Sequence, residues 1–163
     1  MNIFTVPYGS NDFYARPDTS LNKDSNDYFC PDYITGLAAS VFVYARAIKA
    51  GKSVASKFAP RYYNAIGTGV HFWVPEMVSP DSPQTWWMAH SLDNTTFLSG
   101  DEADAASFPA EITERINNAF ATISRNVSFR TGDYIAIEIS KEEMLGNGHK
   151  SYRIKEKEIN LIW

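Results

Sequence analysis

One long helical pattern stands alone in this 163-residue chain, and it limits the folds that the chain can adopt. Ser107 can cap a helix, and Pro109 suits its first turn. Apolar residues then recur at the spacing of one helix face, at Ile112, Ile116, Phe120, Ile123 and Val127. We therefore predict one amphipathic helix over residues 109–127.

The remaining segments favour strands and turns. Branched and aromatic side chains, or alternating polarity, predict strands at residues 1–7, 34–48, 67–74, 129–140 and 151–163. Residues 56–67 predict a short helix, because Pro60 stands in its first turn and Gly67 follows its end. Strands and helices do not alternate, which argues against a doubly wound sheet. The sequence predicts a mainly β fold of the α+β class, with one long and one short helix.

Length and charge narrow the class of protein further. A chain of 163 residues suits a single domain over 1–163, in which residues 1–12 form a short N-terminal strand or arm. A formal charge of −4 argues against a nucleic-acid or anionic-membrane partner, since both attract basic patches. No apolar run approaches the roughly 20 residues that cross a bilayer, and the first residues lack a signal-peptide pattern. We expect a cytoplasmic protein.

Short motifs alone indicate no enzyme. The histidines His71, His90 and His149 are far apart in the sequence, so their spacing predicts no metal site. Glu156 and Glu158 would share one face of a strand, as a cation site needs. Lysines alternate with them, however, and a solvated strand edge is the better interpretation.

Taken in order, five segments resemble the fumarylacetoacetate hydrolase family in its compact bacterial form. "FYARPDTSL" (13–21) resembles the family's "F-x-K-P-D-T-x-L", and "WWMAHSLD" (86–93) resembles "W-x-x-A-K-x-F-D". "AGKSVASKFAPRYYNAIGTGVHFWVPEM" (50–77) resembles the family's turn, helix and strand. The helix at 109–127 and the strands that begin at "FRTGDYIAI" keep the family's order. The resemblance implies a mixed β-roll or sandwich that pairs into homodimers.

The same resemblance indicates that the family's metal site is degenerate here. Family enzymes hold Mg²⁺ through Glu-x-Glu on one strand and an Asp on another, and these positions fall on Ser40, Phe42 and His71. A hard cation needs several anionic oxygens at short range. A hydroxyl, a phenyl ring and an imidazole do not supply them, so we expect no metal ligands and no cofactor.

Other functional positions of the family are also replaced. Its lysine in "W-x-x-A-K" falls on His90, and its Thr-Gly-Thr-Pro loop falls on residues 137–140, where Glu138 would repel an anionic substrate. The lid expected near the N-terminus is shortened to "PYGSND". Only Arg16 keeps the charge that the resemblance implies.

Two functional hypotheses follow, beside a chance resemblance. The first is a non-catalytic homologue with a binding, assembly or regulatory role, a homodimer with room for a small carboxylic acid ligand. The second is an enzyme, a hydrolase or lyase acting on a 2-oxo or β-diketo acid. It would use His71 and His90 as catalytic residues, and Arg16, Ser40 and Glu76 would bind substrate. In the second hypothesis imidazoles could also hold a softer ion such as Zn²⁺.

Overall fold

Two sheets and one long helix form the architecture of the computed structural model, which describes residues 1–163. The strands are β1 (Ile3–Val6), β2 (Tyr14–Arg16), β3 (Asp27–Phe29), β4 (Gly36–Arg46), β5 (Ala65–Trp73), β6 (Thr96–Leu98), β7 (Ala103–Asp104), β8 (Tyr134–Glu138), β9 (Glu143–Gly146), β10 (Ser151–Ile154) and β11 (Lys157–Ile162). The helices are α1 (Gln84–Ala89) and α2 (Ala110–Asn126), with 3₁₀ turns η1 (Asp18–Ser20), η2 (Ser56–Arg61), η3 (Pro75–Met77) and η4 (Ala105–Ser107).

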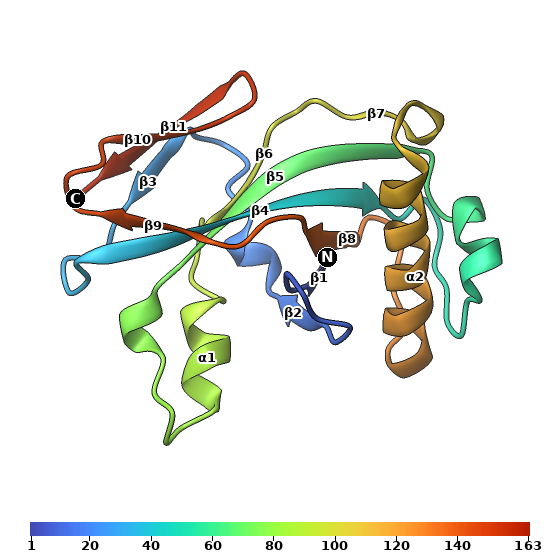
Figure 1. The fold of residues 1–163 in the computed structure, drawn as a ribbon, viewed down its shortest axis with the longest axis horizontal. Helices are drawn as coiled ribbons and strands as arrows, with labels where there is room; N and C mark the ends of the chain where they lie inside the picture. The colour runs from blue at the N-terminus through green and yellow to red at the C-terminus, as the bar shows by residue number, and fades with distance from the viewer.

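The large sheet is built around the two longest strands. Its order is β2-β1-β8-β4-β5-β6, with β7 paired to β5 and β9 paired to β4, and the small sheet has the order β10-β11-β3. Figure 1 shows α2 standing against one end of the large sheet, the small sheet at the other end, and α1 projecting below. The prediction of a mainly β, α+β fold is confirmed.

The large sheet rolls up until its two edges meet. After β2 the chain passes through η1 and hydrogen-bonds to the segment around β6. The Asn22 amide donates to the Thr96 carbonyl at 2.9 Å, and the Asn94 amide donates to the Thr19 carbonyl at 2.9 Å. These bonds satisfy backbone groups that an open sheet edge would expose. The roll therefore has an interior face, which β4 shares with its neighbours.

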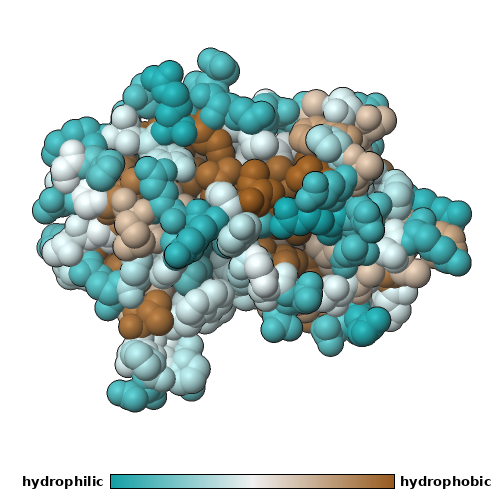
Figure 2. Space-filling view, viewed as in Figure 1, coloured by the Kyte–Doolittle hydropathy of each residue, from teal (hydrophilic) through white to brown (hydrophobic).

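Helix α2 covers the outer face of the roll. The predicted helix over 109–127 is confirmed, and its buried residues are Ile116, Ala119, Phe120, Ile123 and Ser124. The four apolar residues among them pack with Val43 and Ala45 of β4 in the largest hydrophobic core cluster. A second core cluster lies where β4 and β5 meet the small sheet. Figure 2 shows apolar residues between these two ends, bordered by hydrophilic side chains.

Aromatic side chains of β4 fill the interior face, and glycines of β5 make room for them. Phe42 lies opposite Gly69, and Tyr44 lies opposite Gly67. A Cβ atom added at Gly67 would stand 2.7 Å from the Tyr44 ring, and one added at Gly69 would collide with the Phe42 ring. Both rings can lie across β5 only because these two positions carry no side chain.

Several segments differ from the sequence-based expectation, and the short strands β2, β3, β6, β7 and β9 were not predicted. Residues 151–163 form the hairpin of β10 and β11 and not one strand, because Lys155 adopts a left-handed φ of 53° and reverses the chain. The short helix expected over 56–67 is the six-residue 3₁₀ turn η2. Helix α1 was not predicted, since its six residues are too few to show helical periodicity.

The packing of Phe42 against Gly69 gives a testable prediction. Gly69→Ala should lower the free energy of unfolding by about 1–3 kcal/mol, because the added methyl group overpacks the interior. Gly146→Ala is the matched control, since a Cβ there meets no atom within 4 Å. Urea denaturation measures both. In the Phe42→Ala background the cost of Gly69→Ala should shrink, and an unchanged cost would show that the ring is not the obstacle.

Candidate functional site

The interior face of the roll brings together residues that the sequence keeps far apart. Ser40 of β4 pairs with His71 of β5, and Phe42 is the next residue of β4 on the same face. On the opposite wall, Thr5 of β1 pairs with Tyr14 of β2. The three positions that the resemblance assigns to metal ligands are therefore neighbours in space.

Phe42 and His71 are stacked on each other at the centre of this face. Their ring centroids lie 4.0 Å apart with 20° between the ring planes, and both side chains are fully buried. A stacked aromatic pair adds about 0.5–1.5 kcal/mol beyond the burial of its area. The phenyl ring thus covers one side of the imidazole completely.

Both ring nitrogens of His71 have protein partners. Nε2 lies 3.2 Å from Thr5 Oγ1, and Nδ1 lies 3.1 Å from Thr96 Oγ1. Burial, and then the positive charge of Arg16, hold the pKa of His71 well below its usual range. His71 is therefore a neutral imidazole, fixed by two threonine hydroxyls.

His90 lies between two tryptophan rings at the end of α1. Its ring centroid is 3.9 Å from that of Trp86 and 4.3 Å from that of Trp73. Nδ1 donates to the Trp86 carbonyl at 2.7 Å, because a carbonyl oxygen can only accept. The neutral ring therefore carries its proton on Nδ1. Burial lowers the pKa of His90 to about 4.

Arg16 is a fully buried cation without a carboxylate partner. Nε donates to Thr96 Oγ1 at 3.1 Å, and Nη2 donates to Thr95 Oγ1 at 2.6 Å and to the Phe72 carbonyl at 3.3 Å. Its Nη1 has no hydrogen-bond partner, and neither does the hydroxyl of Tyr14. Burial raises the pKa of Tyr14 to about 12, so the phenol stays protonated. Arg16 thus joins β2 to β6 across the interior.

Ser40 and Glu138 complete the interior set. Ser40 Oγ accepts a hydrogen bond of 3.2 Å from Trp73 Nε1. Glu138 of β8 pairs with Phe42, and its Oε2 accepts from the Tyr8 amide at 3.0 Å. Burial raises the pKa of Glu138, although the field of Arg16 opposes that rise.

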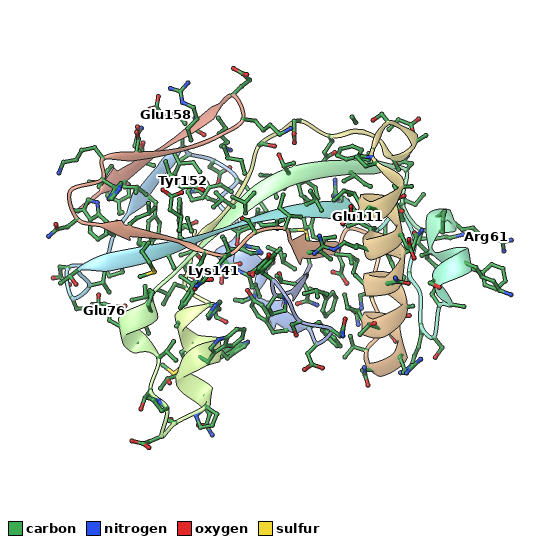
Figure 3. The ribbon with its side chains drawn as sticks, in the orientation of Figure 1. Arg61, Glu76, Glu111, Lys141, Tyr152 and Glu158 are labelled. Atoms are coloured by element: carbon green, nitrogen blue, oxygen red, sulfur yellow. The ribbon has the colours of Figure 1, made fainter.

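Glu76 lies outside this cluster. It sits on η3 with an exposed side chain, and its carboxylate accepts from the amide and the hydroxyl of Thr35 at 2.6 and 3.2 Å. Figure 3 shows Glu76 at the far end of β4, away from the centre of the sheet. The other four expected site residues, Arg16, Ser40, His71 and His90, line or border the interior.

Two residues of the candidate site could not be found from sequence patterns. Thr5 and Thr96 hold the ring of His71, yet a threonine in a short strand carries no functional signal. Tyr14 could have been suspected, because it stands two residues before Arg16 and so shares its strand face.

The residues at the expected metal positions do not fit a hard divalent cation. No group of three His, Cys, Asp or Glu side chains is placed to hold a metal ion. Ser40 Oγ already accepts from Trp73, both nitrogens of His71 are engaged, and Phe42 offers no ligand atom. Magnesium requires an octahedron of oxygen ligands, which this cluster cannot supply.

Comparisons with sequence families and with curated protein sequences gave no match. Comparison with solved structures did. A fumarylacetoacetate hydrolase family protein from Yersinia pestis superposes with a TM-score of 0.74 at 14% identity, over 99% of this chain and 93% of that chain. Fumarylpyruvate hydrolase from Pseudomonas aeruginosa, solved with Mn²⁺ and pyruvate, gives a TM-score of 0.66 at 12% identity, over 99% and 89% of the two chains.

A third structure supports the same conclusion about the fold. The 5-carboxymethyl-2-hydroxymuconate delta-isomerase from Mycobacterium smegmatis gives a TM-score of 0.73 at 9% identity, over 99% of this chain and 76% of that chain. The chain therefore has the fold of fumarylacetoacetate hydrolase family proteins, as the resemblance implied. No helix is both long and apolar enough to cross a membrane.

The buried neutral histidines make stability depend on pH. Burial lowers the pKa of His90 from 6.5 to about 4, so below pH 6.5 the unfolded chain binds a proton that the folded chain does not. The stabilisation is complete above pH 6.5. It falls by up to about 1.4 kcal/mol per pH unit as the pH drops toward the folded pKa.

Urea denaturation at pH 7.5, 6.0 and 5.0 measures this loss. His90→Gln should make the dependence on pH shallower, whereas replacement of the exposed His149 by Gln should leave it as in the parent protein. Equal slopes for the parent protein and His90→Gln would contradict the assignment.

Proposed function

We propose that this chain is a non-catalytic member of the fumarylacetoacetate hydrolase family, with a binding, assembly or regulatory role. One observation carries the proposal. The Phe42 ring stacks on His71 at 4.0 Å in a fully buried interior, where the resemblance places the metal ligands. The space that a hydrated cation and its substrate would need is occupied by the protein itself.

Electrostatics explains why such replacements would persist. Carboxylates packed together without a cation repel one another, and each buried charge costs several kcal/mol even after relaxation. Ser40, Phe42 and His71 are uncharged in this interior, so these three positions need no cation to offset repulsion between them. A chain that no longer needs the ion would keep such residues.

Some proteins with a similar structure are enzymes, and the donor groups of this chain bear on whether it shares their activity. One was solved with Mn²⁺ and pyruvate, and others are named as a hydrolase and as an isomerase. Those names describe the other proteins. The donor groups of this chain differ from what a hard cation requires, so we do not extend the metal-dependent activity to it.

The alternative is a hydrolase or lyase that acts on a 2-oxo or β-diketo acid through a remodelled histidine site. The tautomer of His90 favours it, because Nε2 is left as a free base. So does Arg16 Nη1, a buried donor without a partner that could bind an anionic oxygen. Against it, a pKa of about 4 makes His90 a weak base at neutral pH.

A metal and substrate titration distinguishes these functions. We expect no saturable heat from Mg²⁺ or Mn²⁺ in calorimetry with the full chain, and no turnover of oxaloacetate or an acylpyruvate with either ion. Tight Mg²⁺ binding together with turnover would overturn the proposal. Turnover that needs no Mg²⁺ and is lost in His90→Gln would establish the histidine-based alternative. His149→Gln serves as the matched control.

We also propose a homodimer. Phe29, on the edge strand β3, is 70% exposed, and its neighbour Ile162 on β11 is 39% exposed. An exposed apolar strand edge is a site where two chains can pair.

Sedimentation should therefore give twice the mass of the chain. Replacing Phe29 by Ser should shift the protein toward monomer, whereas replacing the exposed Phe58 on η2 by Ser should not. A parent protein that sediments as a monomer at all concentrations would refute the dimer.

A further inference from the structure

A cavity of about 470 Å³ lies at the end of the roll where β4 finishes, beside the buried rings of Phe42 and Tyr44. Arg46, at the end of β4, and Tyr134, at the start of β8, are cross-strand partners and both line it. Arg46 is six residues from Ser40 along the same strand, which corresponds to about 20 Å. The volume is within the range of pockets that bind small molecules.

Three cations line this cavity, and no acidic residue does. They are Lys23, Arg46 and Lys157. Neither salt bridge of the structure includes any of them, since these join Arg153 to Glu158 and Lys155 to Asp101. In a chain with a formal charge of −4, such a local excess of positive charge is not a consequence of composition. Like charges around one cavity repel, so an anion bound between them would be stabilised.

The cations keep free hydrogen-bond donors. Lys157 Nζ donates to the Leu98 carbonyl at 3.0 Å, which fixes the ammonium group and leaves two of its three protons unused. Burial also lowers the pKa of Lys157, as expected for a cation that lacks a counter-ion. The Arg46 guanidinium lies 5.8 Å from the centre of the Tyr134 ring and donates no hydrogen bond to the protein. Its planar set of donors suits a carboxylate or a phosphate.

The floor of the cavity is apolar. Leu21, Leu98 and Tyr134 line it, and they pack on the buried rings of Phe42 and Tyr44. Glu102 lies close to this floor, because its Oε1 accepts from the Tyr44 hydroxyl at 2.7 Å. A ligand that fits would combine a compact apolar body with anionic groups that reach the cations.

We propose that this cavity binds a small organic anion, with two or more negative charges on a compact apolar body, between Lys23, Arg46 and Lys157. The residues that line the cavity do not include Ser40, Phe42 or His71, although Leu21 and Leu98 of its floor pack on the Phe42 ring. The proposed binding of an anion depends on the residues of the cavity, and it does not depend on whether the chain is catalytic.

Calorimetric titration of the full chain at constant ionic strength tests this proposal. The probes are phthalate for carboxylates, phenyl phosphate for phosphate esters, and neutral phthalamide as the uncharged control. We expect saturable binding of at least one anion and none of phthalamide. Tighter binding of phthalate would indicate a carboxylate ligand, and tighter binding of phenyl phosphate would indicate a phosphate ester.

Variants then locate the binding. Arg46→Gln and Lys157→Gln should each weaken it about tenfold, which is the effect of losing one charged hydrogen bond. Lys150→Gln, outside the cavity, should bind as the parent protein does. Circular dichroism checks that each variant is folded. The proposal fails if neither anion binds, if phthalamide binds as tightly as phthalate, or if Arg46→Gln and Lys157→Gln bind like the parent protein.

Discussion

Closure of the large sheet on itself is the constraint from which the other properties of the molecule follow. The backbone bonds between the segment after β2 and β6 bring the two edges together, and Arg16 spans the same seam with side-chain bonds to Thr95 and Thr96. A rolled sheet of this kind has an interior that excludes water. A polar group placed there is costly unless it finds a protein partner or loses its charge, and Arg16 Nη1 and the Tyr14 hydroxyl still carry that cost. The neutral state of His71 and the raised pKa of Glu138 are both results of that rule.

The distribution of charge along β4 reflects the same constraint. At the sealed middle of the strand stand Ser40 and Phe42, which carry no charge, and at its open end stands Arg46, whose side chain is exposed. Uncharged residues thus stand where water is excluded, and the cation stands at the mouth of the roll, where water reduces the cost of its charge. Arg16 is the exception, because three neutral oxygens surround its guanidinium in place of an anion.

Elements with strong periodicity could be predicted from the sequence, and contacts across the roll could not. The spacing from Ile112 to Val127 was enough to place α2, and the order of short segments was enough to identify the fold. Helix α1 is too short for periodicity, and the β10–β11 hairpin turns at Lys155, a residue type that gives no turn signal. The four clustered site residues came from the resemblance. Their partners depend on pairing between strands far apart in the chain, which no local pattern encodes.

The position of β1 has a consequence for how the protein is made. This strand is not a free arm: it lies between β2 and β8 and runs parallel to β8, so that Phe4 is paired with Ile135. Closing a loop between residues so far apart in the sequence is slow, because the entropy of the chain is lost before the contacts between β1 and β8 can stabilise it. A growing polypeptide cannot complete the roll until β8 has left the ribosome. Most of the chain must therefore be synthesised while its first strand waits for a partner, and that interval is when protection from aggregation matters most.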